Sequence, residues 1–149
     1  MAGQPSLCEM CVGGEVEGVR QALQAGAGPN TDDGHPMTYL MYAVLGRQSE
    51  VVSLLLSWPG VDPNAKAKHN KTALHWACEA GDIAVLQLLL AVPGLEVNER
   101  ISGEGGHTPI FRAIAAENYG AVNILANLDG VDLDVKTDEG ETLEENIQR

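Results

Sequence analysis

The stretch TALHWACEAGDIAVLQLLLAVPGLEVN, residues 72–98, decides how this chain folds. A short apolar helix is predicted at its start, and Gly81 is the kind of residue that commonly ends a helix. A second helix follows and closes with Leu88-Leu89-Leu90, after which Pro93-Gly94 marks a turn. The stretch therefore predicts two short helices that pack as a pair and lead into a loop.

The same pattern recurs along the chain. Leu40, Leu74 and Ile110 occupy equivalent positions, spaced 34 and 36 residues apart. An alanine follows each of them three residues later, and an apolar triplet and a closing turn come after it. The alanines are Ala43, Ala77 and Ala113. Self-similarity at a fixed period predicts stacked units that bury a shared core, because one helix pair cannot bury its apolar face alone.

These units resemble the ankyrin repeat. The segments Thr72-Ala73-Leu74-His75 and Thr108-Pro109-Ile110 are similar to the T-P-L-H-x-A motif of that family, and the spacing is close to its period of about 33 residues. The resemblance implies an all-α fold, an ankyrin-repeat solenoid of helix-turn-helix units with hairpin fingers. It implies a single domain over residues 1–149 with about four repeats and a partial C-terminal cap. We expect the units at about 5–32, 33–66, 67–102 and 103–136, with the cap at 137–149.

The two ends of the chain carry weaker versions of the unit. Ser6 and Glu9 have the spacing of a capping box, which starts a helix. Glycines make this first pair the least stable one, since each glycine inside a helix costs about 1 kcal/mol relative to alanine. Thr142 and Glu145 repeat the capping-box spacing at the other end, in a polar segment that suits a terminal repeat. The chain either ends with this helix or is a piece of a longer protein.

Composition and net charge bear on the kind of partner, the core and the cellular compartment. The formal net charge is −12, and such a field repels phosphate backbones and gains nothing at an anionic membrane, so we expect neither nucleic acid nor a membrane as partner. Aromatic residues are only 4 % of the chain, so the core must be mainly aliphatic. The N-terminus lacks the pattern of a secretory signal, and with no such signal the three cysteines favour a reducing compartment. We expect a monomer in the cytoplasm, the nucleus or both.

No pattern of catalytic residues stands out. Cys8 and Cys11 form a C-x-x-C pair without two further ligands at zinc-site spacing, so we interpret them as small core residues. The resemblance implies that His75 bonds backbone between neighbouring units, and no nucleophile or carboxylate near it in sequence suggests catalysis. The glycines of residues 103–106 lack the ending of a phosphate-binding loop. We therefore expect no enzyme activity, no cofactor and no metal.

The resemblance implies a partner-binding surface on the concave side, made by finger tips and inner helices. Tyr42, Trp76 and Arg112 share one helix position, and these residue types are enriched where binding energy concentrates. Trp58 lies near an outer loop, as a second contact or as a cap over a helix end. The expected partner-binding residues are His35, Met37, Tyr42, Leu45, Lys68, His69, Lys71, Trp76, Glu79, Glu104, His107, Arg112, Asp138 and Glu139.

Charge is uneven along this surface. The segment 66–71 is basic, while the last third of the chain is acidic. The pattern favours a protein or peptide partner with a basic region, bound non-enzymatically. Two alternatives stay open: an inhibitor that occludes a signalling protein such as a kinase, and a substrate-recruiting domain of a larger scaffold or enzyme. Arg47 and Glu117 depart from the family pattern, because each replaces the glycine that stands at Gly81.

Overall fold

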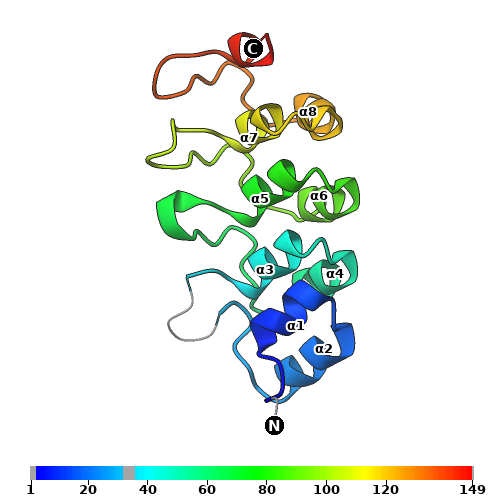
Figure 1. The fold of residues 1–149 in the computed structure, drawn as a ribbon. Coiled ribbons are helices and arrows are strands. Elements are labelled where there is room, and N and C mark those ends of the chain that lie inside the picture. Colours follow the sequence, from blue (N-terminus) through cyan, green and yellow to red (C-terminus); the bar gives the residue numbers. More distant parts are fainter. Residues whose placement is uncertain (1–2, 32–35, 149) are drawn as a thin grey trace.

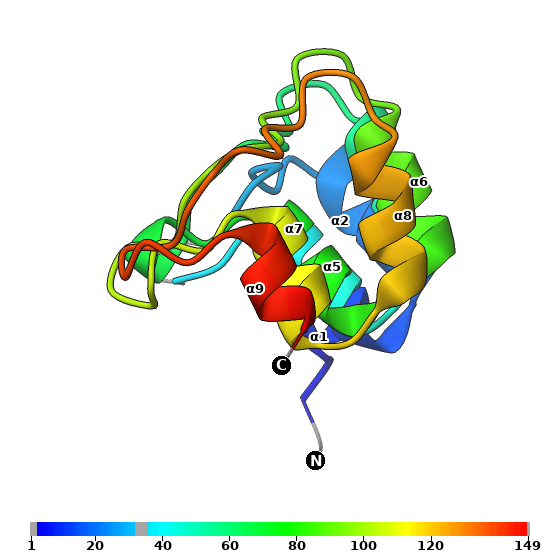
Figure 2. The ribbon, with the colours of Figure 1, turned by 90° about the horizontal axis from the view of Figure 1, so that it is seen from above.

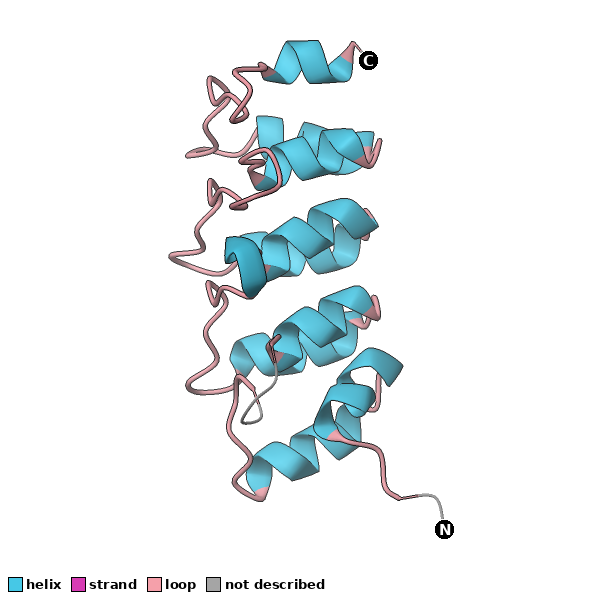
Figure 3. Ribbon diagram, turned by 60° about the vertical axis from the view of Figure 1, so that its left-hand side comes forward, coloured by secondary structure: helices cyan, strands magenta, loops and turns pink. Residues whose placement is uncertain are grey.

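The computed structural model describes residues 3–31 and 36–148 as a solenoid of stacked helix pairs (Figure 1). Inner and outer helices form two parallel columns, and the loops gather along one edge (Figure 3). The inner helices are α1 (Leu7–Gly13), α3 (Tyr39–Leu45), α5 (Ala73–Ala80), α7 (Pro109–Ala115) and α9 (Leu143–Ile147). The outer helices are α2 (Val16–Gln24), α4 (Ser49–Ser57), α6 (Ile83–Leu90) and α8 (Tyr119–Ala126). A short 3₁₀ turn, η1 (Lys68–Asn70), lies in a finger, and the described residues contain no strand, so the all-α prediction is confirmed.

Each inner helix packs on the next one, in the order α1, α3, α5, α7 and α9. The small residues Ala43, Ala77 and Ala113 are fully buried at these contacts. Larger side chains there would overpack the contact at a cost of about 1–3 kcal/mol each. Leucines and valines of the outer helices fill the rest of a core that is largely aliphatic. Trp58 follows the last residue of α4, where its backbone N–H donates to the Leu55 carbonyl, and its side chain packs half-buried against this core.

The inner helices start with a hydroxyl residue whose partner three positions later differs from unit to unit. Thr38 is paired with the sulfur of Met41, and Thr142 with the carboxylate of Glu145. Thr72 donates its backbone N–H to Nδ1 of His75 over 3.1 Å. In α7 the equivalent residue is a phenylalanine, and the buried hydroxyl of Thr108 has no partner among the described residues. The polar start of the helix is thus the same in each unit, while the third residue is free to vary.

Asparagines in the outer turns connect each unit to the next. Asn98 donates from Nδ2 to the Gly130 carbonyl over 2.7 Å and accepts from the Asp132 N–H over 2.8 Å. Asn30 and Asn64 make the same pair of bonds to their own following turns. The side chain satisfies one donor and one acceptor of a turn that would otherwise be held by water alone.

The turn after each inner helix needs a left-handed residue. Gly81 has φ of 68°, and the equivalent residues Arg47 and Glu117 have φ of 57° and 59°. A side chain at such a φ costs about 1 kcal/mol or more because Cβ approaches the following carbonyl. The departures from the family pattern at Arg47 and Glu117 therefore keep the turn but strain it.

Glu117→Gly should raise the free energy of unfolding by about 0.5–1 kcal/mol, because it removes this strain and no ion pair. Urea denaturation measures the change. Arg47→Gly is the matched control: Arg47 also donates from Nη2 to the Ala80 carbonyl over 2.8 Å, so its replacement should gain less. A lower stability of Glu117→Gly would contradict the strain argument.

Asn98→Asp should lower the free energy of unfolding by about 1–2 kcal/mol, because it loses the donor and sets a carboxylate against the Gly130 carbonyl. Asn123→Asp is the control, since it makes the same charge change at an exposed position of α8 whose Oδ1 only accepts a bond. Equal effects of the two variants in urea denaturation would show that the added charge, and not the loss of the Asn98 hydrogen bonds, is responsible.

Candidate partner-binding surface

The fingers project from the stack at an angle to the inner helices, so the two form adjoining sides of one surface (Figure 2). We call this the inner surface: the exposed residues of α3, α5 and α7 together with the finger loops 66–71, 100–107 and 136–141. Residues at equivalent positions of successive inner helices form rows along it, since each helix packs on its neighbour.

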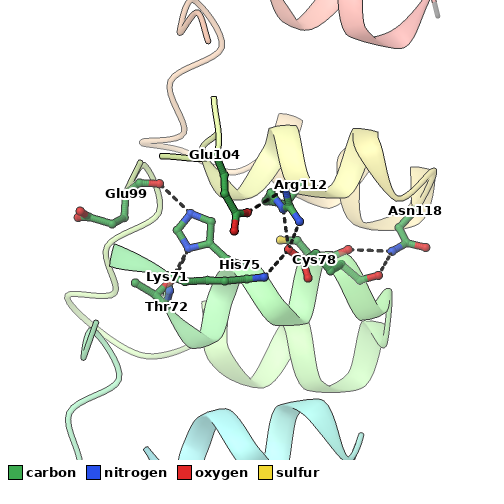
Figure 4. Close-up of polar contacts among 9 residues, drawn as sticks. Lys71, Thr72, His75, Cys78, Glu99, Glu104, Arg112 and Asn118 are labelled. Carbon is green, nitrogen blue, oxygen red and sulfur yellow. Dashed lines mark hydrogen bonds and ion pairs between the residues drawn. The ribbon is translucent and has the colours of Figure 1, made fainter. Parts of the chain in front are cut away.

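A carboxylate, Glu79 of α5, lies at the centre of the inner surface. Its Oε1 is 2.8 Å from Nζ of Lys71 and is also contacted by Arg112 of α7, at 2.6 Å from Nε and 2.5 Å from Nη2. At the other end of the guanidinium, Nη1 lies 3.6 Å from Oε2 of Glu104 on the next finger (Figure 4). Two cations therefore share one carboxylate, and the network connects a finger base, two inner helices and a finger tip.

An apolar area adjoins this network. Nζ of Lys71 lies 4.8 Å from the centroid of the Trp76 ring, a cation–π distance. Trp76 and Tyr42 are half-buried, and the side chain of Leu45 is 46 % exposed. Tyr42, Trp76 and Arg112 belong to one row, and Leu45 and Glu79 to the next. The inner surface thus changes from apolar at α3 to charged at α7.

The fingers are connected to one another. The Ser102 N–H donates to the His69 carbonyl over 2.7 Å, and the Asp138 N–H donates to the Gly105 carbonyl over the same distance. Arg100 adds a bond to the Asp138 carboxylate over 2.9 Å. These contacts hold successive loops in register, so their tips are presented as one continuous edge.

Two histidines near the inner surface are held neutral. Burial lowers the pKa of His75 to about 4, and the ring is fully buried. Its Nε2 lies 2.9 Å from the Glu99 carbonyl, which can only accept, so Nε2 carries the proton and Nδ1 accepts from Thr72. Burial, and then the charge of Arg112, also lower the pKa of His107, whose ring stacks on Phe111 at 5.5 Å between centroids.

Comparison with known families agrees with this architecture. A family model described as ankyrin repeats, in three copies, matches residues 40–137. The chain belongs to the ankyrin-repeat family. Ankyrin repeats are generally protein–protein interaction modules and are typically non-enzymatic. No curated protein matches the chain.

Other features of this ankyrin-repeat chain bear on chemistry. Within residues 3–31 and 36–148, no group of three or more His, Cys, Asp or Glu is placed to hold a metal ion. Cys8, Cys11 and Cys78 are buried in the core and form no disulfide bond within the described residues, and burial raises the pKa of Cys78. No helix in the described part of the chain is long and apolar enough to cross a membrane.

The structure brings five of the expected residues of the ankyrin-repeat surface into one contact network: Lys71, Trp76, Glu79, Glu104 and Arg112. Tyr42 and Leu45 lie beside that network on α3. Lys68, His69, Asp138 and Glu139 are exposed on finger tips, and Met37 is half-buried in the first finger. His107 packs against Phe111 within its own unit. His35 lies outside the described residues.

Sequence reasoning overlooked the ion pairs between neighbouring ankyrin units. Lys66 pairs with Glu99 at 3.0 Å, and Arg100 with Asp138 at 2.9 Å. A signal was present: Lys66 and Glu99, like Glu79 and Arg112, are opposite charges 33 residues apart. Because one repeat separates residues at equivalent heights in adjacent layers, opposite charges at that spacing are expected to meet.

The free energy of unfolding should decrease as pH decreases, because of His75. Its pKa of about 4 in the folded state lies below the ordinary 6.5, so between these values the unfolded chain binds a proton that the folded chain does not. The contribution of neutral His75 to the free energy of unfolding is complete above pH 6.5. It decreases by about 3 kcal/mol as pH falls towards 4.

Urea denaturation of the native chain and of His75→Met, which copies Met41 of the preceding unit, measures this dependence. The difference in the free energy of unfolding between the native chain and His75→Met should decrease as pH falls from 7 to 4. His69→Gln, at an exposed position of a finger tip, is the control and should keep the contribution of His75. An unchanged difference would show that His75 does not titrate with unfolding.

Proposed function

We propose that the inner surface binds an extended segment of another protein and that the chain acts by this binding and not by catalysis. The observation that carries the proposal is the network of Lys71, Glu79 and Arg112 beside a partly exposed apolar area. A few fixed polar groups next to apolar surface are typical of sites that orient a ligand.

The network is organised before any partner arrives. Glu79 is only 24 % exposed and is contacted by cations from two sides, which restricts the side chains of Lys71 and Arg112. Side chains that are already ordered lose less conformational entropy on binding, by about 0.5–1.5 kcal/mol each. Trp and Arg are also the residue types that most often dominate binding energy.

The overall charge supports a partner that carries a basic region. The net charge is −12, and a hollow of about 440 Å³ beside α9 is lined by Glu139, Gly140, Glu141, Glu145 and Gln148. A field of this sign raises the rate at which basic segments associate and lowers it for nucleic acid and anionic membranes. We further propose that the chain works as a monomer in the cytoplasm or nucleus.

Replacing apolar residues of the inner surface should strongly weaken partner binding while the fold is kept. In affinity capture from a matched lysate, Trp76→Ala with Leu45→Ala should weaken capture by about 30-fold or more, the loss expected for a hot spot. Tyr119→Ala is the matched control, because Tyr119 is 57 % exposed on the outer helix α8. Circular dichroism verifies that each variant is folded.

The opposite result would place binding elsewhere. If Tyr119→Ala loses the captured protein and the inner-surface variants retain it, the inner surface is not the binding site. Binding that does not weaken as salt is added would contradict the role of the acidic region, because exposed charges are screened over about 8–10 Å at physiological salt.

A further inference from the structure

Arg112 contacts two carboxylates on very unequal terms. Its Nε and Nη2 lie 2.6 and 2.5 Å from Oε1 of Glu79, which is largely covered. Its Nη1 lies 3.6 Å from Oε2 of Glu104, and the side chain of Glu104 is 46 % exposed on a finger tip. Glu79 therefore fixes the guanidinium, and Glu104 is a long-range partner at its outward end.

Replacing Glu104 at this position costs little. An ion pair at this distance contributes weakly to stability, because the Glu104 side chain remains solvated and loses entropy when it pairs. Losing Glu79 would leave two partly covered cations without their shared carboxylate, which is far more costly. The outward edge of Arg112 is thus available to another carboxylate that brings better geometry.

We propose that a carboxylate side chain of the partner segment takes the place of Glu104 on Nη1 of Arg112. The inference rests on the proposed function, and it specifies the chemistry of the bound segment. An apolar side chain of the same segment lies on Tyr42, Leu45 and Trp76. Glu104 then acts as an internal competitor that occupies the position until the partner arrives.

The geometry favours a carboxylate for two reasons. The guanidinium is planar and presents donors in a fixed fork that matches carboxylate oxygens. Lys71 shares Glu79 with Arg112, so these three side chains together carry a net positive charge, which favours an anionic group as the next partner of Arg112. Glu79 is engaged by both cations, so the N–H groups of Arg112 that remain for a partner carboxylate are those on the side where Glu104 lies (Figure 4).

The spacing within the segment follows from the stack. Trp76 lies one inner helix before Arg112, and packed helices are about 8–10 Å apart. An extended chain rises about 3.3 Å per residue. Alternate side chains of an extended chain face the same side, so the acidic residue and the apolar residue are about two or four positions apart in the partner. The basic region of the partner lies beyond the acidic residue, towards α9.

Selection of random peptides on the native chain, followed by binding titrations with the selected synthetic peptides, tests the inference. The selected peptides should share an Asp or Glu about two or four residues from an apolar residue, by the spacing above. Changing that acid to its amide should weaken binding about tenfold, the usual effect of losing a charged hydrogen bond.

The protein variants give the sharper test. Glu104→Gln removes the competitor and should tighten binding of the selected peptide by up to about fivefold, the range of an exposed ion pair. Glu50→Gln is the matched control: it makes the same charge change at an exposed position of the outer helix α4, outside the inner surface, and should leave binding unchanged. The gain should disappear with the amide form of the peptide.

Each other outcome overturns a different statement. The selected peptides could depend on Trp76 and Leu45 but lack the acidic residue, or they could bind Glu104→Gln and the native chain equally. Either result would refute the proposed contact between a partner carboxylate and Arg112, and it would leave the proposed function standing. Peptides that carry Lys or Arg and are weakened by Glu104→Gln would show that Glu104 itself is the contact. If no selected peptide depends on the inner surface, the proposed function fails and this inference fails with it.

Discussion

The close approach of successive inner helices is the constraint on which the rest of this structure depends. Ala43, Ala77 and Ala113 are fully buried where one helix lies on the next, and only a small side chain permits that distance. Because a helix pair cannot cover its own apolar face, each layer is stabilised by its neighbours. The regular stack then sets the positions of fingers, turns and rows of side chains.

Repetition also separates the residues that build a layer from the residues that can vary. The hydroxyl residues at the start of the inner helices are retained, while the third residue of these helices is Glu9, Met41, His75, Phe111 or Glu145. A carboxylate, a sulfur or an imidazole bonds the helix start in four of these helices, whereas the phenylalanine makes no such bond and the Thr108 hydroxyl has no partner among the described residues. Only His75 reaches further, to the Glu99 carbonyl in the following loop. The buried variation therefore affects local stability and its pH dependence.

Variation at the exposed positions of the inner helices has a different consequence. Equivalent positions along the inner surface carry Tyr42, Trp76 and Arg112, so a single row passes from apolar to charged. The contacts that Glu79 makes with Lys71 and Arg112 join two layers, and they also order the side chains that a partner would meet. Stability and recognition thus share the same groups, and a change at Glu79 is expected to affect both.

The sequence by itself determined the class of fold and the position of each helix pair, because apolar periodicity, small residues and turn residues act locally and recur at a fixed spacing. It also indicated which residues face the inner surface, since the row positions follow from the repeat. It did not determine which charges meet. The sharing of Glu79 by two cations and the long contact of Glu104 with Arg112 depend on the distance between layers and on the path of a finger. Those are set by packing between units about one repeat apart, so only the tertiary structure decided them.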